Sequence, residues 1–303
     1  KPHGDEDQSF LKIIGACNVP VVWKDNTWEH VNNRIGKIMH PDEYFWLRNG
    51  IKYDFTRIYT NDLGCIGFSG RYPDNLIEEI SNYEAVASVL AHQLEFDVIH
   101  SHDWLTYPAG VFVKRITGKP LVIHVHATDF DRSRGKVNPT VYNIEKTGMD
   151  IADHIITVSN LTRKIVIEKY HQDPRKVTTV HNAVEPLEHV ESFVKKPRKD
   201  KVVTFLGRIT MQKGPEYFVE AAHRVIQRTK NVRFVMAGSG DMMDAMIDLA
   251  AKRGIADRFH FPGFQRGSEV HEMLAQSDVY IMPSVSEPFG ISPLEAMQVG
   301  TPS

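Results

Sequence analysis

The sequence predicts an α/β protein of two domains, and three observations lead to this fold class. The chain has 303 residues, which exceeds the usual size of a single hydrophobic core. From about residue 95 onward, short β-rich runs alternate with helical patterns, as is typical of parallel βαβ units. A charged, proline-bearing stretch without periodicity, residues 185–200, separates two such series. We therefore predict an N-terminal domain 1–184, a linker 185–200 and a C-terminal domain 201–303.

The first series predicts four buried parallel strands, because its β-rich runs are apolar and separated by helical patterns. Upstream of it, residues 74–94 have the pattern of a helix, and residues 12–23 are interpreted as a strand. The expected strands are 96–100, 120–126, 154–159 and 177–181, and the expected helices lie near 107–116, 141–152 and 160–170.

The second series repeats this alternation and predicts a second parallel sheet. Residues Gly300–Ser303 resemble a helix C-terminus followed by the start of a further strand, and the chain opens on Lys1 without a methionine. We therefore expect both sheets to be incomplete and the chain to be a fragment truncated at both ends. The expected strands of this series are 202–207, 232–238, 259–261 and 278–282, with helices near 215–229, 241–253 and 268–276.

The composition is that of an ordinary globular protein, with 42% hydrophobic and 24% charged residues. A formal net charge of -2 gives no reason to expect a nucleic-acid partner. The two cysteines are too few for a disulfide framework, and no apolar run is long enough to span a membrane. We therefore expect a cytoplasmic protein. The basic cluster 195–199 is interpreted as part of a solvated linker, with contact to anionic lipid, and so peripheral membrane association, as the alternative.

Two carboxylates flank a glycine-containing turn near the C-terminal end of the chain. Glu287 follows the expected strand 278–282, and Glu295 lies in the first turn of an expected helix. Ser292 is predicted to be the N-cap of this helix and Pro293 its first residue, which places Glu295 at the third position of a capping box. Ligands of open α/β sheets bind at the carboxyl ends of strands. The segment therefore predicts a site for an anion or a sugar, with a purely capping role as the alternative for Glu295.

Two cations, Arg208 and Lys213, follow the expected strand 202–207 and precede a helix. They converge on a helix N-terminus, where the helix dipole already favours anions. Arginine offers a planar fork and lysine a movable point charge, which together suit a diphosphate. The alternative is a pair of surface cations in a turn. Gly238-Ser-Gly240 lacks the third glycine of a dinucleotide fingerprint and so argues against a dehydrogenase.

Histidines lie at the ends of two strands of the first series. His124 and His126 are expected on one face of a strand, because side chains alternate along it. His102 and Asp103 end another strand and are a candidate source of a third metal ligand. The sequence lacks a recognisable ligand-spacing motif for zinc, however, and we predict no metal. A histidine that hydrogen-bonds substrate or packs is the favoured interpretation.

Taken together, these motifs resemble the retaining glycosyltransferases of family 4 over roughly residues 95–303. Their combined order and spacing make the resemblance specific, whereas no single motif would. The resemblance implies the GT-B fold, in which two Rossmann-like domains with parallel sheets face a cleft. The matching segments are F-D-V-I-H-x-H-D-W from Phe96, I-H-V-H-A from Ile123, I-I-T-V-S from Ile155, H-N-A-V from His181, G-R…K-G from Gly207 and E-P-F-G-I-S-P-L-E from Glu287.

The resemblance also implies an activity and a role for each motif. The activity is that of a retaining, metal-independent hexosyltransferase without a cofactor. It moves a sugar from a UDP-, ADP- or GDP-linked donor to a hydroxyl of a glycan, sugar or lipid. Arg208 and Lys213 would stabilise the departing diphosphate, Glu287 would lie beside the donor sugar, Glu295 would bind the ribose, and His126 would contact the sugar from the other domain. Further implied positions are Gly207, Gly238, Phe264, Gly290 and Ile291 at the nucleotide sugar, and His102 and Asp103 on the acceptor side of the cleft.

Other functions fit part of the pattern. A glycoside hydrolase needs two flanking acids and no phosphate site, so Arg208 and Lys213 argue against it. A nucleotide-sugar epimerase of the same architecture and a non-catalytic sugar-nucleotide-binding module stay as alternatives. The sequence also departs from the family, because no glycine-rich loop opens the chain and Ala183 stands where a glycine is common.

Overall fold

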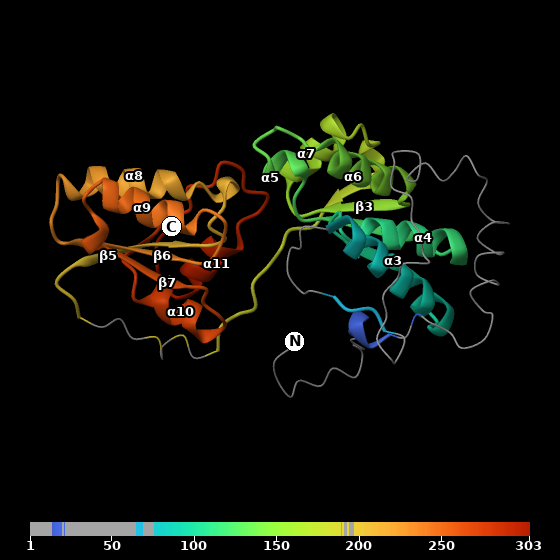
Figure 1. Ribbon diagram of the computed structural model, residues 1–303, viewed down its shortest axis with the longest axis horizontal. Helices are drawn as coiled ribbons and strands as arrows, with labels where there is room; N and C mark the ends of the chain where they lie inside the picture. Colours follow the sequence, from blue (N-terminus) through green and yellow to red (C-terminus); the bar gives the residue numbers. More distant parts are fainter. Residues whose placement is uncertain are drawn as a thin grey trace. The chain divides into compact units, whose positions relative to one another are not determined.

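A computed structural model gives the fold of the chain (Figure 1). Helices alternate with parallel strands, so the predicted α/β class is confirmed. The chain divides into two compact units, one with residues 1–125, 143–156 and 172–177, the other with residues 126–142, 157–171 and 178–303. The structure describes residues 14–19, 21, 65–68, 76–188, 190, 193 and 197–303.

The first sheet contains four strands in the order β1-β2-β3-β4. β1 and β2 are parallel, and their register places His102 opposite His124. Alternate residues of β2 point into the core, where Leu121 and Ile123 are fully buried. The strands are β1 (Ile99–His102), β2 (Leu121–Val125), β3 (His154–Thr157) and β4 (Val177–Thr179).

Local sequence signals set the ends of the helices around this sheet. α4 starts with a proline in its first turn and ends at Gly118, whose left-handed backbone (φ 72°) lets its N–H reach the carbonyl of Lys114. Ser159 is the N-cap of α7, and its side chain accepts from the N–H of Thr162. The helices are α3 (Leu76–Gln93), α4 (Tyr107–Thr117), α5 (Asp129–Arg132), α6 (Pro139–Ile151) and α7 (Asn160–Lys169), with a 3-10 turn at Pro174–Lys176.

Two predicted elements of the N-terminal half are wrong in part. β1 begins at Ile99 rather than Phe96 and continues to His102, because pairing with β2 sets its length. Residues Ala16–Asn18 form a 3-10 turn where a strand was expected. The remainder of the strand predicted at 12–23, the helix start at 74 and part of the basic cluster 195–199 lie outside the described residues. The linker at 185–200 is described only in part, and the division of the chain there stays a prediction.

The second sheet contains four parallel strands in the order β7-β6-β5-β8. β5 therefore lies between β6 and β8, although β8 comes last in the sequence. Along the chain, β6 and β7 are added on one side of β5 and β8 on the other, so the strand order reverses at β5. Ligands of open parallel sheets bind at the carboxyl ends of the strands where the order reverses. The strands are β5 (Lys201–Leu206), β6 (Val232–Ala237), β7 (Phe259–Gly263) and β8 (Val279–Tyr280).

Helices cover both faces of the second sheet, with α8 and α9 over one face and α10 and α11 over the other (Figure 1). Under α8, the ring of Phe218 packs edge-on against Phe234 and Phe259. In the described part of the chain, no helix has the length and apolar character needed to cross a membrane. The helices are α8 (Pro215–Ile226), α9 (Met243–Lys252), α10 (Ser268–Ala275) and α11 (Ile291–Gln298), with 3-10 turns at Met211–Lys213 and Ala256–Arg258.

Candidate functional site

The carboxyl edge of the second sheet carries the candidate site. Because β5 and β8 are parallel neighbours, the chain segments that follow them leave the sheet at the same edge. The segment after β5 passes through the 3-10 turn Met211–Lys213 into α8. The segment after β8 passes through an irregular loop, residues 281–290, into α11. The N-termini of α8 and α11 thus lie at the same edge of the sheet, and helix N-termini favour an anionic ligand.

Lys213 and Glu287 meet at this edge. Lys213 Nζ lies 2.6 Å from Glu287 Oε2, and the two side chains are only 22% and 17% exposed. Ser284 Oγ donates to the same carboxylate oxygen at 2.9 Å. A lysine ammonium has three donors, so this contact leaves two for another ligand. The pair therefore presents a fixed cation beside a fixed carboxylate.

The turn that carries Lys213 is docked on the loop that carries Glu287. The N–H of Val285 donates to the carbonyl of Gln212 at 2.9 Å, and Gln212 Nε2 donates to the carbonyl of Ser286 at 3.3 Å. Gly214 caps α8 with a left-handed backbone (φ 62°), and a Cβ there would come closer than 3.0 Å to the carbonyl oxygen of Pro283. Only glycine combines this backbone conformation with so close an approach.

The start of α11 differs from the prediction. Gly290, with φ 85°, is the N-cap, and the helix begins at Ile291, so Ser292 is not the N-cap. Glu295 consequently lies beyond the position that a capping box requires, and the capping role predicted as its alternative is wrong. The physical reason is that the left-handed glycine starts the helix two residues earlier than a serine cap would. Among the residues that the structure describes, no side chain caps α11, so its first N–H groups stay available for a ligand.

Glu295 and Glu287 share an electrostatic environment around Tyr280. Burial raises the pKa of the half-buried Glu295 above its ordinary value, and His271 opposes this effect. Burial also raises the pKa of the Tyr280 hydroxyl, a hydrogen bond with Ser292 lowers it, and the charges of Glu287 and Glu295 raise it further. Both predicted carboxylates therefore act on the same buried hydroxyl. Glu287 also lies against the N-cap of α11, where a Cβ on Gly290 would be 3.4 Å from Glu287 Cγ.

Glycines line the neighbouring part of the same edge. The N–H of Gly238 donates to the carbonyl of Gly263 at 2.8 Å, and a Cβ on Gly238 would overlap the carbonyl of Gly207. The predicted positions Gly207 and Gly238 are thus brought together at the ends of β5 and β6. Phe264 follows Gly263 and is 62% exposed. Gly207 and Gly263 are half-buried and Gly238 is buried, so the exposed ring of Phe264 is the surface that a base can approach here.

Arg208 lies two residues after the end of β5 and is exposed. Among the described residues, no acidic side chain forms an ion pair with Arg208. The structure thus brings Lys213 and Glu287 into contact and leaves Arg208 at the same turn with its guanidinium in solvent. Ile291 is also exposed (43%), at the first position of α11.

The remaining predicted residues lie in or after the first sheet. His102 is the last residue of β1, and Asp103 follows it with a left-handed backbone (φ 58°). His126 follows the end of β2 and is half-buried. His124 does not form a metal-competent group with His126. It groups instead with His100 and His102.

Three residues of the site were missed by the sequence analysis. Ser284 hydrogen-bonds Glu287, Gln212 holds the loop, and the charges of both carboxylates raise the pKa of the Tyr280 hydroxyl. Of these three residues, only Gln212 had a sequence signal for a role in the site, because it is a polar residue inside the G-R…K-G segment. In the structure its side chain is buried. Nothing local indicated that Ser284 and Tyr280 point to the site, because this depends on the path of the chain after β8.

Two family models match the chain. A model described as "Glycosyl transferases group 1" matches residues 189–303, and one described as "Glycosyltransferase Family 4" matches residues 67–186. The chain belongs to glycosyltransferase family 4. Its motifs at Gly207–Gly214 and Glu287–Glu295 both lie within the first of these matches.

Individual relatives of the chain agree with the family. An uncharacterized glycosyltransferase of Methanocaldococcus jannaschii is 33% identical over 69% of this chain and 57% of its own length. A galactosyltransferase of Escherichia coli, named for UDP-Gal and a GlcNAc-diphosphoundecaprenol acceptor, is 26% identical over 75% of this chain and 62% of its own. The chain thus spans less than two thirds of the length of these curated relatives.

Solved structures confirm the GT-B fold of the chain. The crystal structure of Anabaena HepE in complex with UDP and glucose has a TM-score of 0.62 at 18% identity. The match covers 75% of this chain and 63% of HepE. At this identity the likeness establishes the fold alone.

Proposed function

We propose that the protein transfers a sugar from a nucleotide-diphosphate donor to a hydroxyl acceptor, with retention of the anomeric configuration and without a metal ion. The observation that carries the proposal is the 2.6 Å contact between Lys213 and Glu287, placed between the glycine-capped N-termini of α8 and α11. The ammonium of Lys213 would bind the diphosphate. The carboxylate of Glu287 and the backbone N–H groups at the start of α11 would bind the sugar. A hydrolase would need no such cation at this position.

The chemistry follows from where charge develops. Breaking the sugar–diphosphate bond places negative charge on the leaving group, and fixed cations stabilise that charge most in the transition state. Lys213 is held by Glu287 and keeps two donors for phosphate oxygens. Arg208, exposed on the same turn, adds a planar fork for the same group. Together they supply the positive charge that a metal ion would otherwise provide.

The other roles complete the donor site. Glu295 accepts hydrogen bonds from the ribose, Gly290 and Ile291 present N–H groups, and His126 contacts the sugar. Gly207, Gly238 and Phe264 border the phosphates and the base. The UDP in the HepE crystal structure and the UDP-Gal in the name of the E. coli relative support a uridine donor as the first to test.

The acceptor is proposed to be the hydroxyl of a carbohydrate or of a lipid-linked sugar, and His102 and Asp103 are assigned to its side. The lipid-diphosphate acceptor in the name of the E. coli relative supports the second of these. A lipid-linked acceptor would be met at a membrane surface, so peripheral association is part of the proposal. A cytoplasmic location stays a prediction.

The test combines binding and transfer. Calorimetric titration with UDP, ADP and GDP identifies the base, and release of nucleotide from the sugar-linked donor, with and without acceptors, measures transfer. Lys213→Ala and Arg208→Ala are each expected to reduce turnover by roughly 10²–10³-fold, the scale for losing one electrostatic stabiliser. Lys252→Ala in the last turn of α9 and Arg228→Ala after α8 are matched controls, because both residues are exposed cations outside the site.

Each outcome has a definite meaning. Binding without transfer to any acceptor would identify a non-catalytic sugar-nucleotide-binding module. Equal turnover in the Lys213 variant and the Lys252 control would refute the diphosphate role. Failure to bind any of the three nucleotides would overturn the proposal as a whole.

A further inference from the structure

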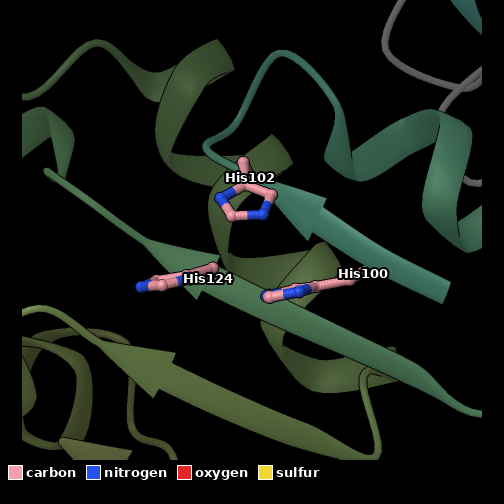
Figure 2. A group of neighbouring side chains, drawn as sticks. All are labelled: His100, His102 and His124. Atoms are coloured by element: carbon pink, nitrogen blue, oxygen red, sulfur yellow. The ribbon is translucent and has the colours of Figure 1, made fainter. Parts of the chain in front are cut away.

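Three histidines meet on one face of the first sheet, and none of them belongs to the segments that form the proposed donor site. His100 and His102 lie two residues apart on β1, so their side chains leave the same face of the strand. His102 is directly opposite His124 of β2 in the parallel register. Figure 2 shows the three rings gathered on the same side of the two strands.

The three rings are close enough to share one ion. Their centroids lie 4.4 Å apart for His100 and His102, 5.0 Å for His102 and His124, and 5.4 Å for His100 and His124. One ring nitrogen of each lies within 4.8 Å of those of the other two. In tetrahedral zinc sites, with Zn–N near about 2.1 Å, ligand nitrogens are about 3.4 Å apart. The rings therefore need to approach by roughly 1.4 Å at most, which rotation about the soft χ2 angle of histidine provides.

The backbone that carries these rings is held in place by hydrogen bonds. Thr106 Oγ1 donates to the carbonyl of His102 at 2.8 Å. The N–H of Asp103 and the hydroxyl of Tyr107 donate to the carbonyl of His124 at 3.0 and 3.4 Å. Ligands that are already positioned lose little conformational entropy on binding, so a preorganised group binds more tightly.

The face that carries the rings is open, whereas the opposite face is packed. Ser101, between the two histidines of β1, is buried against Gly110 of α4. His100 and His102 are exposed, and both ring nitrogens of His124 are shielded from solvent. An ion can therefore arrive from solvent through the two exposed rings and be held against the shielded one.

We infer that His100, His102 and His124 bind one divalent transition-metal ion of the zinc class. Neutral imidazole suits zinc, cobalt, nickel and copper ions, whereas magnesium and calcium prefer oxygen ligands. Three protein nitrogens leave a fourth position for water or another ligand. The ion ties β1 to β2 where both strands end, directly before Asp103. This group shares no residue with the proposed donor site at Lys213, and it contains His100 in place of the His126 considered from sequence alone.

The site is tested on the full chain, produced without a polyhistidine tag and stripped of metal. Calorimetric titration with Zn²⁺ is expected to show one ion per chain, and Co²⁺ is expected to give the visible absorption of tetrahedral nitrogen coordination. Mg²⁺ at the same concentrations is expected to show no binding. Because the ion binds the folded state, Zn²⁺ also raises the melting temperature in a concentration-dependent way.

Variants assign the ion to these rings. His100→Ala, an exposed position, and His124→Asn are each expected to weaken Zn²⁺ binding at least about tenfold. His92→Ala, an exposed histidine in the last turn of α3, is the matched control and is expected to leave Zn²⁺ affinity unchanged. UDP binding measured on the same samples shows that each variant is folded and reports separately on the donor site. Absence of Zn²⁺ binding by the folded wild-type chain, or equal affinity in the His100 variant and the His92 control, would overturn the inference.

Discussion

Replacing Gly214 by alanine tests the contact on which the proposed donor site depends. Gly214 has a left-handed backbone, which costs an L-residue about 1–2 kcal/mol. The new Cβ would also stand closer than 3.0 Å to the carbonyl oxygen of Pro283, so the turn and the loop must separate by roughly 0.5 Å or more. Overpacking of this kind costs about 1–3 kcal/mol. The expected total destabilisation is about 2–5 kcal/mol.

Gly254→Ala is a matched control for the backbone cost. Gly254 has nearly the same left-handed backbone (φ 67° against 62° for Gly214), but a Cβ there meets nothing within 4 Å. This variant is expected to lose only about 1–2 kcal/mol. The difference between the two variants therefore measures the crowding at Gly214, which comes from the carbonyl of Pro283 and the ring of Tyr217.

The separation also moves Lys213 away from Glu287. A contact of 2.6 Å that lengthens by roughly 0.5 Å loses the short geometry of a charge-assisted hydrogen bond. Misplacement of this size is expected to reduce transfer roughly 10–100-fold in Gly214→Ala and to leave Gly254→Ala close to wild type. Urea denaturation gives the stability, and nucleotide release from the donor gives the rate. Equal destabilisation of the two variants with equal rates would refute the reasoning.

Two further predictions concern pH. Asp153 accepts from Lys114 Nζ at 2.6 Å and from the N–H of Leu121 at 2.7 Å, and the hydrogen bond with Lys114 is the main cause of its lowered pKa. Asp153→Asn is expected to cost about 1 kcal/mol at pH 7, a value reduced for solvent screening. The cost should shrink as pH falls below the ordinary aspartate pKa, because protonated Asp153 no longer contributes. Urea denaturation at pH 7 and pH 3 checks this, and an equal cost at both values would contradict it. Burial raises the pKa of Glu295, so its ionised form destabilises the folded protein, which is the opposite of the effect at Asp153. Glu295→Gln should therefore be at least as stable as wild type at pH 7. This gain in stability should vanish below the ordinary glutamate pKa, where Glu295 is neutral in both the folded and the unfolded protein. The same variant should bind UDP more weakly in calorimetry, and a variant less stable than wild type at pH 7 would show that burial is not the cause.

Most helices and strands were predictable because their signals are local. Periodicity placed α4 near Tyr107–Thr117 and α8 at Pro215, and a proline or a left-handed glycine fixed their ends. β1 was displaced because its length depends on pairing with β2, and the start of α11 was displaced because Gly290 adopts a backbone that no local pattern announced.

The sequence by itself determined the family, the α/β class and the charged residues that the family motifs carry, because composition, periodicity and motif spacing are properties of neighbouring positions. Only the tertiary structure paired Lys213 with Glu287, which are 74 positions apart, because that contact depends on β8 lying beside β5. The same holds for the histidines. Their residue types were visible in the sequence, but the parallel register of β1 and β2 decided which three of them meet.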